Sequence, residues 1–256
     1  MRILQKIADF YIDASIHVAL AIASLVYVTQ LDIYFDYSSA IFFGTIVAYN
    51  FLKYIELIAV KKVISVKIKA IIIFTILSFL AFLFFFFGME RKIQLQLFLT
   101  GILVLVYPFL RKQGWLKLFI VSFVITITTA LIPFSFDEVI GSDWPIVVLQ
   151  RFFFVTSLMV PFEIYDSQFD KESLHTFPQR FGIRKVKLFG ILLVIPFLVL
   201  EFLKVNSSLA VIPVGIITVL AIHFTSLKRN EYYTSFWVES IPIVWLILLL
   251  VFNKMF

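Results

Sequence analysis

Residues 163–182 read Glu163-Ile-Tyr-Asp166-Ser-Gln-Phe-Asp170-Lys-Glu172-Ser-Leu-His175-Thr176-Phe-Pro178-Gln-Arg180-Phe-Gly182 and follow about eighteen mostly apolar residues. The stretch is therefore expected where a membrane helix emerges into water. Asp166 and Asp170 are four residues apart, which places both carboxylates on one face of a continuing helix, with Glu163 one turn deeper. Carboxylates at the mouth of an apolar helix are costly without a cation. We expect one Mg²⁺ at Asp166 and Asp170, because Mg²⁺ accepts one or two carboxylates and completes its shell with water and phosphate oxygens.

The composition is that of a polytopic membrane protein. Of the 256 residues, 62% are hydrophobic and 15% are charged. In a soluble domain, roughly half of the residues are apolar and about a quarter are charged. We expect an all-α fold in a single domain over residues 1–256, with about nine transmembrane helices of about 20 residues each. The chain has no cysteine, which excludes disulfides and thiolate metal sites.

Apolar runs define the expected spans, at about residues 14–31, 38–58, 68–87, 93–110, 115–133, 145–165, 185–203, 208–227 and 236–252. Residues 1–12 precede them and place Ile3, Ile7, Phe10 and Tyr11 on one stripe. This pattern predicts a short helix lying in the membrane interface.

The basic residues predict the orientation of these spans. With the N-terminus in the cytoplasm, 17 of the 22 Lys and Arg residues fall on cytoplasmic segments, as the positive-inside rule requires. The same rule accounts for the net charge of +6, so no nucleic-acid partner is expected. We expect an integral multi-pass protein of a bacterial inner membrane, in contact with membrane lipids.

Polar residues at the ends of the even-numbered spans converge on the cytoplasmic face in this topology. They include Asn50, Lys53, Tyr107, Arg111, Lys112, Asp166 and Asp170. One interpretation is an interfacial belt of aromatic rings and snorkelling cations, which suits Lys228 and Arg229. The other is a functional site, the default for ionisable groups inside a membrane. Arg151 lies far from this face, and we expect it to be a buried structural cation paired with a carboxylate such as Glu201 or Glu239.

Several of these residues carry a resemblance to the UbiA family of intramembrane prenyltransferases. Asp166-x-x-x-Asp170, followed by Thr176-x-Pro178 and Gly182, resembles the second aspartate motif of the family. Tyr107-Pro108-Phe109-x-Arg111-Lys112 resembles the Tyr-Pro…Lys-Arg ending of the fourth span in that family. Asn50 stands where the first motif, Asn-Asp-x-x-Asp-x-x-x-Asp, begins.

The resemblance implies a fold of nine helices around a cavity, in which Mg²⁺ helps to bind a prenyl diphosphate. The prenyl group is then transferred to a lipophilic acceptor. The catalytic residues implied are Asp166, Asp170 and Lys53, and the implied substrate-binding residues are Asn50, Tyr107, Arg111, Lys112 and Arg180.

The first motif departs from the family pattern. The positions that correspond to its three aspartates are Phe51, Tyr54 and Ile58, so a second metal ion has no carboxylates there. Lys53 is the expected substitute, as a fixed cation. The alternative is a non-catalytic protein of the same fold, which binds an isoprenoid or quinone-like lipid or a membrane partner. A transporter ranks below both, because no matching pair of broken spans occurs in the two halves.

Overall fold

The computed structural model describes residues 2–59, 65–110, 114–136, 143–170 and 174–255, and the regular elements in these ranges are helical. The expected all-α class is confirmed. The α-helices are α1 (Arg2–Asp13), α2 (Ile16–Thr29), α3 (Phe35–Ala59), α4 (Val66–Gly88), α5 (Arg91–Leu110), α6 (Leu116–Thr126), α7 (Trp144–Asp166), α8 (Phe177–Phe181), α9 (Ile183–Glu201), α10 (Val211–Phe224) and α11 (Ile241–Met255). Shorter segments are the π-helices η1 (Ile127–Leu131) and η4 (Tyr233–Val238) and the 3-10 helix η2 (Pro133–Phe136).

Helix length and apolarity support several membrane spans. In the described part of the chain, five helical stretches are long and apolar enough to cross a bilayer, or six if the bent pair α1 and α2 forms one span. The integral, multi-pass character is therefore supported. The expected number of nine spans stays a prediction, because the remaining helices are not all both long enough and apolar enough to count as spans.

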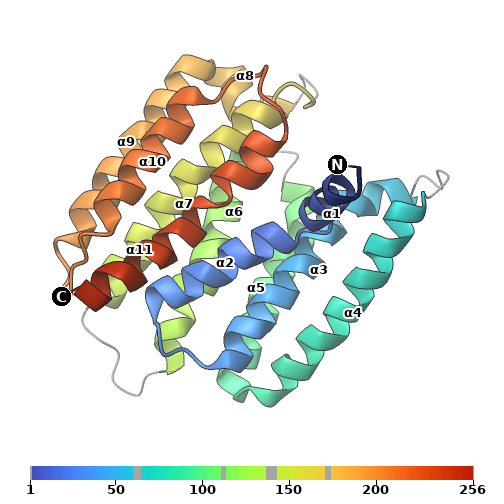
Figure 1. The fold of residues 1–256 in the computed structure, drawn as a ribbon, viewed down its shortest axis with the longest axis horizontal. Coiled ribbons are helices and arrows are strands. Elements are labelled where there is room, and N and C mark those ends of the chain that lie inside the picture. Colours follow the sequence, from blue (N-terminus) through green and yellow to red (C-terminus); the bar gives the residue numbers. More distant parts are fainter. Residues whose placement is uncertain (1, 60–64, 111–113, 137–142, 171–173, 256) are drawn as a thin grey trace.

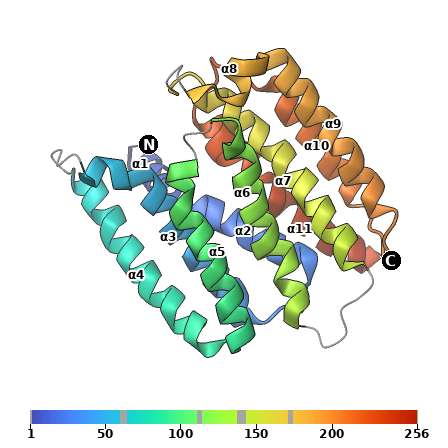
Figure 2. The same ribbon diagram turned by 180° about the vertical axis from the view of Figure 1, so that it is seen from behind.

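The helices form a bundle in which α7 is central (Figures 1 and 2). α3 and α4 lie at one edge, and α9 and α10 lie at the opposite edge. In the apolar window of α7, 56% of the residues are buried, against 11% for α4. α7 is thus surrounded by protein, whereas most of α4 is left to face lipid.

Part of the apolar core lies on the side of α7 that faces α9, α10 and α11. Phe154 of α7, Phe197 of α9 and Trp245 of α11 form an aromatic triad with ring centroids 4.8–5.2 Å apart. These tilted and edge-to-face contacts are the preferred geometry of aromatic pairs. Gly190 lets α9 approach α7 closely, because a Cβ at that position would lie 3.0 Å from Val160. This half of the bundle is tightly filled.

The predicted helix at residues 1–12 is present as a separate element. α1 and α2 meet at an angle of 58°, and Ser15 between them has a φ of 60°. The Ser15 hydroxyl donates to the Asn50 side-chain oxygen at 2.8 Å, which ties the bend to α3. The separate helix is thus confirmed, while its location in the membrane interface stays a prediction.

Arg151 is buried, but its contacts differ from the expected ion pair. Its Nη2 donates to the Thr29 hydroxyl at 2.9 Å, and its Cζ lies 4.9 Å from the centre of the Trp245 ring. No carboxylate lies within salt-bridge distance of it in the described ranges. Glu201 instead binds Lys204 at 2.7 Å and Gln150 at 2.7 Å. The predicted direct ion pair of Arg151 is therefore not found in the described ranges, although the Glu201 carboxylate still interacts with it electrostatically.

Candidate functional site

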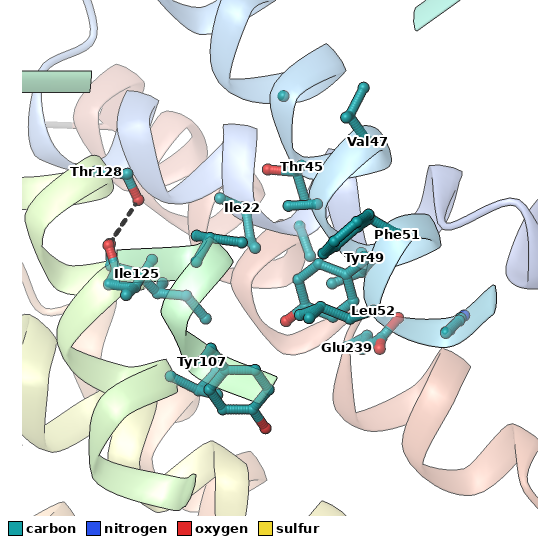
Figure 3. Close-up of a pocket in the computed structure, with 18 of the residues that line it drawn as sticks. Ile22, Thr45, Val47, Tyr49, Phe51, Leu52, Tyr107, Ile125, Thr128 and Glu239 are labelled. Atoms are coloured by element: carbon teal, nitrogen blue, oxygen red, sulfur yellow. Dashed lines mark hydrogen bonds between the residues drawn. The ribbon is translucent and has the colours of Figure 1, made fainter. Parts of the chain in front are cut away.

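The half of the bundle opposite the aromatic triad encloses a cavity of about 1410 Å³. Its walls come from α1 to α7, η4 and the first turn of α11. Much of the wall is apolar and includes Val18, Ile22, Leu25, Phe82, Phe86, Leu97 and Ile125. Figure 3 shows Ile22 and Ile125 in this wall, together with Tyr49, Tyr107 and Glu239. The volume exceeds the usual range for drug-sized ligands and is suited to a long lipid.

Charged side chains also line the cavity. We call this set the charged end, and it comprises Asp9, Asp13, Lys53, Lys67, Lys117, Glu163, Asp166, Glu231 and Glu239. They come together because α3 and α7 finish at this end of the bundle while α4 and α6 begin there (Figures 1 and 2). A cavity with an apolar wall and a charged end is complementary to an amphiphile that has a charged head.

Lys117 contacts two carboxylates in the cavity wall. Its Nζ lies 2.6 Å from Asp166 Oδ2 and 3.3 Å from Glu163 Oε1. The Glu163 side chain is only 3% exposed, whereas that of Asp166 is 43% exposed. Lys117 thus neutralises a deeply buried carboxylate and reaches a second one at the water-accessible rim.

α1 lies against the charged end and is bound there by side chains from three other elements. Lys67 forms an ion pair with Asp13, and the Tyr54 hydroxyl donates to the Asp13 carbonyl at 3.0 Å. The Tyr232 hydroxyl donates to Asp9, and this hydrogen bond raises the pKa of Tyr232 to about 12. Because Tyr232 stays protonated at neutral pH, it remains a donor that anchors α1 over the cavity.

Lys53 is the predicted catalytic lysine, and the structure places it in the cavity wall. Its side chain is exposed and lines the cavity. Among the described residues, the Nζ atom makes one long hydrogen bond, 3.4 Å, to the carbonyl of Ile12. Most of its hydrogen-bonding capacity therefore remains available for an anionic ligand.

Asn50, a predicted substrate-binding residue, is buried and hydrogen-bonded to other protein groups. It is 2% exposed and does not line the cavity. Its amide donates to the Ala14 carbonyl at 3.2 Å and to the Thr75 hydroxyl at 2.8 Å, and its oxygen accepts from Ser15. The side chain joins the α1–α2 bend to α3 and α4, which leaves it little capacity for a ligand.

Only some of the remaining predicted site residues lie in the cavity wall. Asp166 and Tyr107 line the cavity, but Asp170 and Arg180 do not. Asp170 lies in the turn after α7, where its carbonyl accepts from Gln179 at 3.2 Å, and Arg180 is exposed on α8. Arg111 and Lys112 lie outside the described residues.

Two glycines explain why the motif-bearing loops adopt their observed arrangement. Gly114, just before α6, has no room for a side chain, because a Cβ there would lie 2.0 Å from the Leu174 carbonyl oxygen. The start of α6 therefore packs backbone to backbone against the connection that follows α7. Gly182 separates α8 from α9 with a φ of 81°, a conformation that glycine adopts without strain.

The predicted magnesium site finds little support in this geometry. In the described ranges, no three His, Cys, Asp or Glu side chains are placed to share a metal ion. Asp166 is already paired with Lys117, whose positive charge would repel a metal, and Asp170 lies outside the cavity wall. In this arrangement Asp166 would have to exchange its contact with Lys117 for the ion, and an ion at Asp166 and Asp170 stays a prediction.

Sequence reasoning did not place Lys117 and Glu239 in the cavity. Lys117 lies three residues after Gly114, near the start of a span, and looks like an ordinary interfacial cation. Glu239 was one of the two carboxylates expected to pair with Arg151, yet it lines the cavity near Tyr49 (Figure 3). The spacing of Tyr49 and Lys53, four residues apart on one face of α3, was the available signal for this wall.

Comparisons with known proteins support the fold. Sequence searches found no matching family profile and no matching curated protein. A structural search found a solved structure of digeranylgeranylglyceryl phosphate synthase, a membrane prenyltransferase of the UbiA family. It matches with a TM-score of 0.59 and 14% sequence identity, over 98% of this chain and 100% of that chain. At this identity the match establishes the fold alone, so the expected UbiA-like fold is confirmed.

Proposed function

We propose that this protein binds a prenyl diphosphate in its cavity and transfers the prenyl group to a lipophilic acceptor. The observation that carries the proposal is the amphiphilic cavity of about 1410 Å³ in a fold shared with a membrane prenyltransferase. The apolar wall would hold the prenyl chain, and the lysines of the charged end would face the diphosphate.

The lysines supply the electrostatic part of the proposed reaction. When the allylic C–O bond breaks, its electron pair leaves with the diphosphate, so negative charge builds on that group. Lys53 and Lys117 both line the cavity, and a compact ammonium group stabilises phosphate charge effectively. Lys53 is available directly, whereas Lys117 would share its charge between the phosphate and its two carboxylates.

The aromatic wall suits the cationic half of the same step. Phe82 and Phe86 of α4 line the cavity with ring centroids 5.5 Å apart, and Tyr49 lines it from α3. The face of an aromatic ring attracts a cation, so these rings would stabilise an allylic carbocation. The acceptor would then attack the carbocation and form the new bond.

Two observations favour the second candidate, lipid binding without transfer. Lys117 and Asp166 neutralise each other at 2.6 Å, and Phe51, Tyr54 and Ile58 stand at the positions of the first aspartate motif. A site that has lost its metal-binding carboxylates could keep the cavity for an isoprenoid or quinone-like lipid and lose the reaction.

Binding and turnover of farnesyl diphosphate distinguish the two candidates. Protein purified in detergent is titrated with farnesyl diphosphate and with farnesol, each with excess Mg²⁺ or with EDTA. The proposed function predicts tighter binding of the diphosphate than of farnesol, and release of inorganic diphosphate when a lipophilic acceptor is added. Lys53→Met should weaken binding of the diphosphate and leave that of farnesol unchanged.

Each contrary outcome has a distinct meaning. Equal affinity for the diphosphate and farnesol, together with no release of diphosphate, identifies a lipid-binding protein. A requirement for Mg²⁺ in diphosphate binding would restore the predicted metal at Asp166 and Asp170. Binding that persists in EDTA would instead assign the charge compensation to the lysines.

A further inference from the structure

The edge of the bundle formed by α9 and α10 carries a set of cations that the proposed chemistry does not use. We call this set the basic edge, and it comprises Arg184, Lys185, Lys187, Lys228 and Arg229. They come from the first two turns of α9 and from the segment after α10, and none of them lines the cavity. The Lys187 Nζ donates to the His223 carbonyl at 2.8 Å, so the start of α9 lies beside the end of α10 (Figures 1 and 2). The five cations therefore gather at one end of this helix pair.

No carboxylate of the described ranges forms a salt bridge with the basic edge. Glu201 is the one acidic residue among positions 174–230, and it lies at the other end of α9, where it is already paired. Glu231, the next acidic residue along the chain, lines the cavity. Lys117 of the cavity differs, because it contacts two carboxylates. Since like charges repel one another, the basic edge is stabilised by an anion from outside the protein.

The side chains of the basic edge also have hydrogen-bond donors to spare. Arg184, Lys185 and Lys228 are exposed, and in the part of the chain that the structure describes they make no side-chain hydrogen bond. Arg229 is exposed as well, and its Nε donates to the Phe224 carbonyl at 3.2 Å, which leaves the two Nη atoms for other acceptors. Such side chains keep their charged heads in water at the membrane surface. Donors from several residues are therefore available at the depth of the lipid headgroups.

Next to the basic edge, α9 and α10 present apolar side chains to the outside of the bundle. These side chains are 47–57% exposed and recur every three or four positions, at Leu188, Leu192 and Ile195 on α9 and at Ile216, Leu220 and Phe224 on α10. This spacing gives each helix one continuous apolar stripe. Leu188 directly follows Lys187, and Phe224 directly follows His223. Both stripes therefore begin at the level of the basic edge and run away from it along the helices.

We infer that the basic edge binds the headgroup of an anionic phospholipid, whose acyl chains lie along the apolar stripes of α9 and α10. The lipid phosphate accepts hydrogen bonds from Arg184, Lys185 and Lys228, and its charge relieves their mutual repulsion. Anionic lipids attract basic segments next to membrane spans in this way. A free phosphate ion has the same charge chemistry but makes no use of the stripes. The inference is independent of the proposed transfer, because the basic edge lies outside the cavity wall.

Native mass spectrometry tests the inference by measuring which lipids stay bound. Protein in detergent is incubated with equal amounts of phosphatidylglycerol and phosphatidylcholine that have the same acyl chains. Wild type should retain phosphatidylglycerol over phosphatidylcholine by about tenfold, because each exposed cation near the headgroup favours the anionic lipid. The triple variant Arg184→Gln/Lys185→Gln/Lys228→Gln should bring this ratio close to one. Excess inorganic phosphate should leave the bound phosphatidylglycerol in place.

A second triple variant is the matched control for net charge. Lys6→Gln/Lys69→Gln/Arg91→Gln also removes three exposed cations, but these lie on α1, α4 and α5. It should retain the wild-type preference for phosphatidylglycerol. Both triple variants should melt at the wild-type temperature without added lipid, since each substituted side chain is exposed. The double variant Arg184→Gln/Lys185→Gln should lose part of the preference and serves if the first triple variant does not fold.

Equal retention of the two lipids by wild type would overturn the inference, and so would a preference that survives in the folded variants of the basic edge. An equal loss in the control variant would show a general effect of net charge and would also overturn it. Displacement of phosphatidylglycerol by inorganic phosphate would assign the basic edge to a free anion in place of a lipid. A protein that transfers no prenyl group but shows the expected preference leaves the lipid site standing, and only the proposed transfer then fails.

Discussion

Lys117 is the residue on which the ionic balance of the cavity depends most directly. Its Nζ reaches Asp166 at 2.6 Å and Glu163 at 3.3 Å. Glu163 also has one buried oxygen, Oε2, without a hydrogen-bond partner in the described part of the chain. The buried carboxylate is therefore tolerated mainly because Lys117 is present.

Lys117→Met should destabilise the protein by roughly 3 kcal/mol, at the lower end of the cost of breaking a buried ion pair, because Asp166 is partly exposed. The melting temperature in detergent measures this effect. Adding Glu163→Gln should recover part of the loss, since the uncompensated carboxylate is then removed. A single variant that melts at the wild-type temperature would show that Lys117 does not hold this cluster together.

Replacement of Arg151 should have the opposite effect on stability from replacement of Lys117. Its Nε and Nη1 have no hydrogen-bond partner in the described ranges, and its charge is buried without an ion pair. Because an unpaired buried charge has a large desolvation cost, Arg151→Met removes that cost and should keep or raise the melting temperature. Glu201→Gln is the contrasting variant and should lower it, because Glu201 binds Lys204, Gln150 and the Ser208 amide. A strong loss of stability in Arg151→Met would refute this account of its environment.

At the scale of elements, the backbone contact at Gly114 joins the two loops that carry the recognisable motifs. Gly114→Ala places a methyl group where the Leu174 carbonyl oxygen lies 2.0 Å away. One of the two loops must move, and a lower melting temperature is expected.

Gly101 is the matched control, because it lies within α5 and a Cβ there meets nothing within 4 Å. Gly101→Ala should raise stability by up to about 1 kcal/mol through helix propensity. The same change at two glycines is therefore expected to have opposite signs. Destabilisation of equal size at both positions would argue against the packing of the two loops.

Several elements were predictable from local pattern, and others were not. The helices follow from apolar runs that end at charged residues, and the separate helix at residues 1–12 follows from its stripe of apolar side chains. Two features depend on tertiary context. η4 re-aims Glu239, and Lys117 meets carboxylates some fifty positions away in the chain (|i−j| = 49 for Asp166). The spacing of residues within one helix does not predict contacts of this kind between distant segments.

The predicted site residues show the same contrast between local sequence pattern and tertiary contacts. Lys53, Tyr107 and Asp166 do line the cavity, because each lies where a helix approaches the charged end. Asn50 was chosen by its position in a motif, but its amide is engaged in joining α1 to α3 and α4. Position in a motif does not reveal whether the hydrogen bonds of a side chain are already made.

At the scale of the whole molecule, the charged end is expected to face the cytoplasm. The wild-type chain has no cysteine, so single cysteines can report the topology without background. Cysteines at Lys62 and Lys171, which lie outside the described residues, should resist a membrane-impermeant thiol reagent in intact cells. A cysteine at Ser207, in the turn after α9, should react. Labelling of Lys62→Cys or Lys171→Cys without lysis would reverse the orientation.

The central claim is that a prenyl diphosphate occupies the cavity, and photoaffinity labelling with a diazirine analogue of farnesyl diphosphate tests it most directly. α4 contains its own control, because Phe82 and Phe86 line the cavity whereas Phe84 and Phe87 are 76% and 71% exposed on the outside. We predict adducts at Phe82, Phe86 or Ile125 that excess farnesyl diphosphate suppresses. Adducts confined to Phe84 and Phe87, or adducts that no competitor suppresses, would contradict the claim.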